Sequence, residues 1–323
     1  MPSKSVLIAQ GVNEKLERLM PVLFPLATVL GFTVPAVFAP LRPLVPVLFA
    51  VMTLSGSLRL KVSEFGNTVK SPAPILIFFA TFRLLMPLLV MFMASVFFAG
   101  SRDTVTGFIL LFAGPVGVAS FVWVGMFKGD RALALTLILL DTMLAPIAIP
   151  GTLSLLMGQS VEMDMGSIAL SLVWMVVLPT VVGVTVNETS KGKIPDAVCP
   201  YLAPLGKIFL MMVIAANSSA LAGEVNFKDP LVWKVAALGI SLASGGFLLA
   251  RLAGIAARCP GEKKVAMFFC GGLKNISASA TIAVTFFPEA VALPVITGIL
   301  FQQILAAVMS NLIKPVMRDK HAG

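Results

Sequence analysis

The chain has 323 residues, of which 58% are hydrophobic and only 12% are charged, and it carries a net charge of +9. A soluble domain has about 25% charged residues, so this composition excludes an ordinary soluble protein and predicts an all-α membrane protein. The apolar runs are too long and too continuous for a transmembrane β-barrel, and the basic residues fall in short gaps between them, which argues against nucleic acid as a partner.

The residues that commonly carry enzymatic or metal chemistry are scarce. The three cysteines, Cys199, Cys259 and Cys270, form no CxxC pair, and the only histidine, His321, lies in the polar tail. We therefore expect no metal site, no cofactor and no histidine-based catalysis.

The predicted elements begin with a polar, amphipathic segment over residues 1–18, which lacks the apolar core and cleavage site of a signal peptide. About ten apolar segments then follow that are long enough to cross a bilayer. They cover residues 19–38, 44–58, 73–98, 105–126, 132–157, 167–186, 200–222, 231–256, 264–287 and 292–314, and a polar tail, 315–323, closes the chain.

The distribution of basic residues predicts the orientation. Only Arg42, Arg102 and Lys228 fall in the alternate loops that we place outside. This asymmetry predicts that both termini are cytoplasmic, as in a multi-pass protein of a bacterial inner membrane. The loops predicted to be cytoplasmic contain Lys15, Arg18, Arg59, Lys61, Lys70, Lys128, Arg131, Lys191, Lys193, Arg258, Lys263, Lys264, Arg318 and Lys320.

The two halves of the chain resemble each other. Residues 26–34, LATVLGFTV, match 178–186, LPTVVGVTV, and GPVGVAS at 114–120 has its counterpart in GGLKNIS at 271–277. We therefore predict a first repeat over 19–157 and a second over 167–314. With five spans each, the second would be inverted with respect to the first.

The fourth span of this arrangement contains Gly114 and Pro115, and the ninth contains Gly271 and Gly272 at the matching positions, which predicts broken helices. Backbone groups freed at membrane depth are tolerated only within protein or beside a wet cavity, and half-helix N-termini favour an anion. The alternative is that these glycines only allow close helix packing.

Three ionisable residues fall deep within the predicted spans: Arg83, Asp141 and Lys274. Charges at this depth are costly and so indicate function. Asp141 can neutralise one of the two cations, and the sequence leaves its partner open. An Asp141–Arg83 pair could also serve only helix packing.

Three segments carry a resemblance to a known family: residues 52–65, residues 114–120 followed by 128–130, and residues 271–279. Their order and spacing resemble the bile acid:sodium symporter family. The resemblance implies a ten-helix fold with panel and core domains, in which helices four and nine are broken and cross. It also implies alternating-access transport of organic anions such as bile acids. Candidate substrate-binding residues are Val118, Ser120, Asn275, Ser277, Gln302 and Gln303.

The chain departs from this family at the positions that match its sodium sites. Ser120 is retained, but Phe121 replaces an Asn, Cys270 a Glu, Lys274 a Gln and Phe82 another Gln. Oxygen ligands suit a hard cation, whereas a phenyl ring, a thiol and an ammonium do not. We therefore predict a sodium-independent transporter of a small organic anion, working by uniport, exchange or proton coupling.

Several alternatives stay open at this point. Within transporters, these are a sodium-coupled organic anion symporter and an arsenite-type permease, which resembles the chain around residues 121–123 but has a fourth-span Cys absent here. A sensor that binds without transport is a further alternative. An intramembrane enzyme is disfavoured, because the chain has no Gly-x-Ser-x-Gly motif and no histidine within a span. The expected partners are the anion, the lipid bilayer and, as a candidate coupling ion, the proton. Substrate, direction of transport and oligomeric state are not determined by the sequence.

Overall fold

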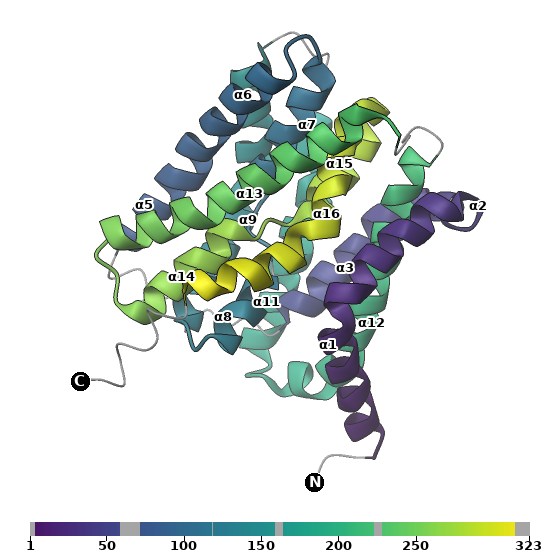
Figure 1. Ribbon diagram of the computed structural model, residues 1–323. Coiled ribbons are helices and arrows are strands. Elements are labelled where there is room, and N and C mark those ends of the chain that lie inside the picture. Colours follow the sequence, from purple (N-terminus) through teal and green to yellow (C-terminus); the bar gives the residue numbers. More distant parts are fainter. Residues whose placement is uncertain (1–3, 59–71, 118, 159–163, 223–227, 314–323) are drawn as a thin grey trace. The chain divides into compact units, whose positions relative to one another are not determined.

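The computed structural model describes residues 4–58, 72–117, 119–158, 164–222 and 228–313 (Figure 1). Every regular element within these ranges is a helix, which confirms the all-helical prediction for them. Of the residues named above, Arg59, Lys61, Lys70, Val118, Arg318, Lys320 and His321 lie outside the described ranges.

Seven helical stretches in the described ranges are long and apolar enough to cross a membrane, so the protein is a multi-pass membrane protein. The predicted spans 105–126 and 264–287 each correspond to two shorter helices, and the predicted first span falls within α1 (Lys4–Thr33) and the short helix after it. A total of ten spans therefore stays a prediction. The seven stretches are Pro35–Ser57, Pro72–Phe97, Arg131–Met157, Gly166–Thr189, Lys193–Ser218, Pro230–Ala256 and Glu289–Leu312.

The chain divides into two compact units, each built from two separate stretches of sequence. Unit 1 comprises Met1–Val62 and Gly166–Glu224, and unit 2 comprises Ser63–Met165 and Val225–Gly323. Each unit therefore takes helices from both predicted repeats. The repeats, 19–157 and 167–314, are a different division of the chain and stay a prediction.

Unit 1 is organised around α12, which packs against α1 and α3, while α3 also packs against α11 (Figure 1). The hydroxyl of Ser55 donates to the carbonyl of Leu202 at 3.0 Å, and that of Ser57 to the carbonyl of Pro179 at 3.2 Å, which joins α3 to both neighbours. The elements of unit 1 are α1, α2 (Pro35–Phe38), η1 (Ala39–Leu44), α3 (Val45–Ser57), α10 (Met165–Leu172), η4 (Val173–Val177), α11 (Leu178–Thr189), α12 (Lys193–Ser218) and η5 (Ser219–Leu221).

In unit 2, α13 packs against α14 and α16, and α16 packs in turn against α7 and α15 (Figure 1). The elements of unit 2 are α5 (Pro72–Phe79), η2 (Ala80–Leu85), α6 (Met86–Phe97), α7 (Arg102–Ala113), α8 (Ala119–Met126), α9 (Arg131–Met157), α13 (Pro230–Ala256), α14 (Gly261–Gly272), α15 (Ile276–Phe286), α16 (Glu289–Met309) and η6 (Ser310–Leu312).

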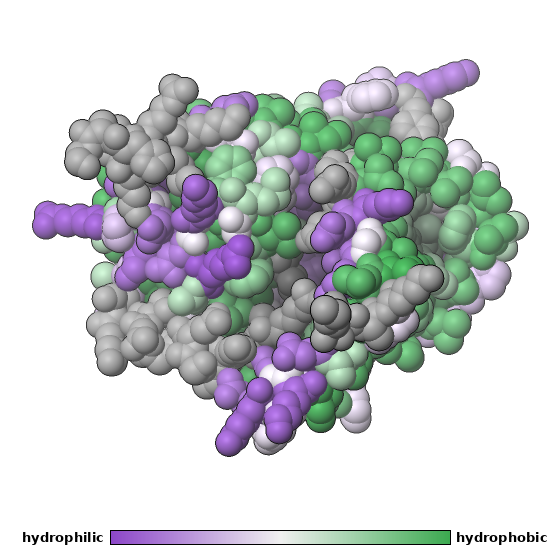
Figure 2. Space-filling model, turned by 90° about the horizontal axis from the view of Figure 1, so that it is seen from below, coloured by the Kyte–Doolittle hydropathy of each residue, from purple (hydrophilic) through white to green (hydrophobic). Residues whose placement is uncertain are grey.

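Many large apolar side chains are exposed on the helices. Ile147 and Leu155 of α9 are 77% and 82% exposed, and Trp174 of η4 is 61% exposed. On the face drawn in Figure 2, hydrophilic side chains gather in clusters beside broad hydrophobic areas. Such apolar surface is what a bilayer covers in a membrane-spanning protein.

Candidate functional site

Two helices of unit 2 are interrupted where the sequence places glycine and proline. Helix α7 ends at Ala113. Gly114 then has an extended backbone that leads into Pro115, a residue that cannot continue a helix, and α8 begins at Ala119. Helix α14 ends at Gly272, and α15 begins after Asn275, whose side-chain oxygen accepts from the N–H of Ala278 at 3.3 Å. Asn275 thus caps the second half-helix.

The two interruptions lie side by side and bond to each other through their main chains. The N–H of Gly117 donates to the carbonyl of Leu273 at 2.9 Å, and the N–H of Asn275 donates to the carbonyl of Pro115 at 2.8 Å. Val116 and Lys274 thereby form an antiparallel bridge. Backbone groups freed by the two breaks satisfy one another in this way, as a low-dielectric surrounding requires.

Gly117 permits this close approach, because a Cβ at its position would lie 2.9 Å from the carbonyl oxygen of Lys274. We refer to the paired stretches 114–117 and 273–275 as the crossing. All of the candidate residues discussed below lie in unit 2, at or beside the crossing.

A π-helical turn, η2, presents Arg83 to the crossing. The N–H of Met86 bonds to the carbonyl of Thr81, five residues back, and Pro87 lacks the N–H that would bond the carbonyl of Arg83 in a regular helix. Phe82, the preceding residue, is fully buried at the same turn.

Arg83 and Asp141 form an ion pair that also makes hydrogen bonds to the main chain at the first interruption. Nε and Nη2 of Arg83 each lie 2.7 Å from Oδ1 of Asp141, and Oδ2 of Asp141 accepts from the N–H of Val116 at 2.7 Å. Nη1 of Arg83 donates to the carbonyl of Ala113, the last residue of α7. The pair therefore binds the last carbonyl of α7 and an N–H within the break.

Lys274 lies within the second interruption and is 5% exposed. Its Nζ has no hydrogen-bond partner among the described residues, and it lies 5.1 Å from the ring centroid of Phe82. The main-chain N–H of Lys274 donates to Oε1 of Gln302 at 3.1 Å. The ammonium thus faces an aromatic ring but, within the described part of the chain, has no oxygen acceptor, which leaves most of its hydrogen-bonding capacity unused.

The other residues that we predicted to match the family's sodium sites lie in two different surroundings. Ser120 and Cys270 are both fully buried, with Oγ and Sγ 3.6 Å apart. The ring of Phe121 lies 6.0 Å from the guanidinium of Arg131. The only oxygen among these side chains is the hydroxyl of Ser120, and it already faces a thiol.

The predicted substrate residues are placed as follows. Gln302 contacts the crossing through Lys274, whereas Oε1 of Gln303 accepts from Nε1 of Trp123 at 3.1 Å. Asn275 and Ser277 are partly exposed beside the crossing, and Val118 lies outside the described residues.

We did not predict Trp123 as a residue of the site from the sequence. Its ring stacks on that of Phe269 of α14, with 5.5 Å between the ring centroids. A tryptophan within a broken span is a sequence signal that could have indicated this position.

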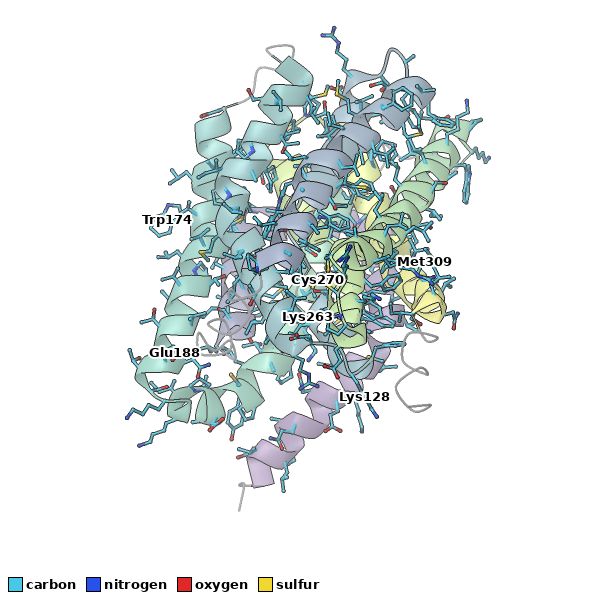
Figure 3. All side chains as sticks on the ribbon, turned by 90° about the vertical axis from the view of Figure 1, so that its left-hand side faces the viewer. Lys128, Trp174, Glu188, Lys263, Cys270 and Met309 are labelled. Atoms are coloured by element: carbon cyan, nitrogen blue, oxygen red, sulfur yellow. The ribbon has the colours of Figure 1, made fainter. Side chains whose placement is uncertain are left out.

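Figure 3 shows how far along α14 the site lies. Lys128 and Lys263 lie towards the same end of unit 2, whereas Cys270 lies deeper along the helix. Lys274 follows Cys270 by four residues. A pocket of about 250 Å³ lined by residues of α6, α7 and α9, including Arg102 and Met157, contains none of the predicted site residues.

The chain is similar in sequence to proteins of a known transporter family. The chain matches the sodium bile acid symporter family over residues 45–225. It is 37% identical to the uncharacterized protein YbaS of Bacillus subtilis over 91% of this chain and 96% of that protein. It is 24% identical to the uncharacterized sodium-dependent transporter YocS of the same organism, over 91% and 90% of the two chains. It is 28% identical to the probable sodium/metabolite cotransporter BASS2 of rice, over 74% of this chain and 58% of that protein. The chain therefore belongs to the sodium bile acid symporter family, whose members are membrane transporters and not enzymes.

Proposed function

We propose that this protein is a secondary transporter of small organic anions that works by alternating access and does not require sodium. The observation that carries the proposal is the buried ammonium of Lys274, which lies at a position matching a sodium ligand of the family and has no hydrogen-bond partner among the described residues.

The chemistry around Lys274 is unfavourable for a sodium ion. Hard cations require several oxygen ligands, and Phe82, Phe121 and Cys270 provide none from their side chains. Two positive charges about 4 Å apart repel each other by about 4 kcal/mol at an effective dielectric constant near 20. The ammonium would thus take over the ion's electrostatic role.

The same surroundings suit an anion. Helices α8 and α15 both begin at the crossing, and the N-terminus of a helix carries partial positive charge. With the ammonium of Lys274, these ends would favour a carboxylate or sulfonate. Asn275, Ser277 and Gln302 are the polar side chains placed to orient such a group.

The proposal includes an architecture. Unit 1 would be the panel domain and unit 2 the core domain of a ten-helix fold, with two inverted repeats and both termini in the cytoplasm of a bacterium. Support comes from the breaks at matching positions, 114–117 and 273–275, and from the distribution of basic residues.

Uptake into proteoliposomes tests the proposal. The probes are radiolabelled taurocholate and radiolabelled lactate, with sodium, potassium or choline as the only external cation. We expect equal rates in the three salts. Lys274→Gln should lower the rate at least about tenfold, corresponding to the loss of about 1.4 kcal/mol of charge-assisted binding. Lys263→Gln, which removes a lysine from the first turn of α14, the helix that precedes the second interruption, is the matched control and should leave the rate unchanged.

Sodium-coupled symport is the second candidate, and the names of the relatives YocS and BASS2 favour it. Accumulation of either probe driven by a sodium gradient in the wild-type protein would establish this candidate and reject sodium independence. A sodium requirement that arises only in Lys274→Gln would instead support the substitution of an ion by the ammonium.

A further inference from the structure

The charges around the crossing do not balance. Arg83 and Lys274 contribute two positive charges, and Asp141 contributes one negative charge. Lys234 and Arg251 lie within α13, and Lys234 is exposed and Arg251 partly exposed. Other charged side chains of unit 2 lie in the turns or in the first turns of helices, such as Arg102, Asp103, Lys128, Asp130, Arg131, Lys263, Lys264 and Glu289.

The geometry assigns the single carboxylate to Arg83. Oδ1 of Asp141 contacts two nitrogens of Arg83, and Oδ2 accepts from the N–H of Val116. Nζ of Lys274 has neither this carboxylate nor any other described group as a hydrogen-bond partner. Among the described residues, the site therefore holds one positive charge that no anionic side chain pairs.

The aromatic face beside Lys274 compensates only part of this charge. The ring of Phe82, 5.1 Å from Nζ, attracts a cation through its quadrupole but accepts no strong hydrogen bond. A buried ion without a paired counter-ion is unfavourable, and the penalty is largest when the site is closed to water on both sides.

From this imbalance we infer that the protein is an obligatory exchanger of organic anions with a single negative charge. The inference rests on the proposed function. During alternating access the site passes through a state closed to both aqueous phases. A bound monoanion neutralises Lys274 in that state, whereas the empty site would pass through it with the ammonium unpaired as long as Lys274 keeps its proton. Return of the carrier therefore requires a second anion.

The same argument specifies the charge of the transported substrate. A dianion would leave a negative charge in the closed site, and an uncharged analogue would leave the positive one. Exchange of one monoanion for another moves no net charge across the membrane, so the rate of exchange should not depend on membrane potential.

The test uses the full-length wild-type protein in proteoliposomes, with radiolabelled taurocholate and lactate as monoanions and radiolabelled succinate as a dianion. Uptake of a monoanion should be at least about tenfold faster into vesicles containing the same unlabelled anion than into empty vesicles, which corresponds to about 1.4 kcal/mol of barrier. The rate should not change when potassium and valinomycin set the potential, and succinate should be taken up no faster than into protein-free vesicles.

The outcomes separate this inference from the function on which it rests. Equal uptake of a monoanion into loaded and empty vesicles would overturn obligatory exchange and leave anion transport intact. The same holds for uptake into empty vesicles that a pH gradient drives, because the carrier would then return without an anion. Absence of protein-dependent uptake of either monoanion in loaded vesicles would contradict the proposed function itself, and the inference with it.

Discussion

Asp141 connects three parts of unit 2 through its two carboxylate oxygens. It neutralises Arg83, it accepts from the N–H of Val116, and through Arg83 it is linked to the carbonyl of Ala113. The sequence predicted that Asp141 would neutralise one of two cations but could not say which. That choice depends on the π-helical turn η2, which Pro87 favours and in which Arg83 contacts Asp141 of α9.

The arrangement predicts that Asp141→Asn is destabilising. Removing one member of a buried ion pair leaves the other charged and unpaired, which typically costs about 3–5 kcal/mol. Thermal unfolding of the purified protein in detergent should show a clearly lower midpoint. Asp103→Asn, in the first turn of α7, is the control and should change stability by less than about 0.5 kcal/mol.

A double-mutant cycle identifies the partner. Arg83→Met combined with Asp141→Asn should recover part of the lost stability, whereas Lys274→Met combined with Asp141→Asn should not. Coupling to Lys274 with none to Arg83 would contradict the charge assignment on which the exchange inference depends.

At the scale of the helix, the end of α14 packs unusually close to its neighbours. A Cβ at Gly271 would meet the ring of Phe82, and a Cβ at Gly272 would meet the ring of Phe247 of α13. Both breaks could be predicted because glycine and proline are visible in the sequence. Their neighbours could not, since Phe82 and Phe247 approach α14 only through the tertiary fold, which no local pattern encodes.

Gly272→Ala should therefore destabilise the protein by about 1–3 kcal/mol, because the added methyl group forces the ring of Phe247 to move. The matched control is Gly245→Ala in α13, where no neighbouring atom lies within 4 Å of the place that a Cβ would take, so the change should be neutral or slightly stabilising. Unfolding midpoints of the two variants provide the comparison. Equal midpoints would show that Gly272 is not required for packing. If Gly272 is required, Phe247→Leu should partly restore the stability lost in Gly272→Ala.

For the molecule as a whole, composition was sufficient to predict a multi-pass helical protein, but the division into units was not predictable in the same way. Each unit joins two stretches that lie far apart in the sequence. Helix number was also less certain than helix type, because α7, α8, α14 and α15 are each shorter than a typical span.

The orientation of the protein in the membrane can be tested within unit 2. The turn before α9 and the turn before α14 lie together, because the N–H of Asp130 donates to the carbonyl of Glu262 at 2.9 Å. These two turns carry Lys128, Arg131, Arg258, Lys263 and Lys264, whereas Arg102 lies at the start of α7. The positive-inside rule therefore predicts the paired turns to be cytoplasmic and Arg102 to be external.

In a cysteine-free background, a membrane-impermeant maleimide applied to intact cells should label Arg102→Cys but not Lys263→Cys. Native Cys259 lies four residues before the labelling position 263. Burial raises the pKa of its thiol and so lowers the thiolate fraction at neutral pH. It should react slowly even in permeabilised cells, so its replacement should not alter the result. The opposite labelling pattern would invert the proposed orientation.

The crossing is held by main-chain hydrogen bonds between Gly117 and Leu273 and between Pro115 and Asn275. Side-chain substitutions do not remove these bonds, provided that position 117 stays a glycine. These main-chain bonds are therefore independent of the side chains at Phe82, Phe121 and Cys270, whereas Asp141 and Arg83 also hold the first interruption. In evolutionary terms, a lineage built on this crossing could exchange its ion-coordinating residues for others, one position at a time, without first losing the fold.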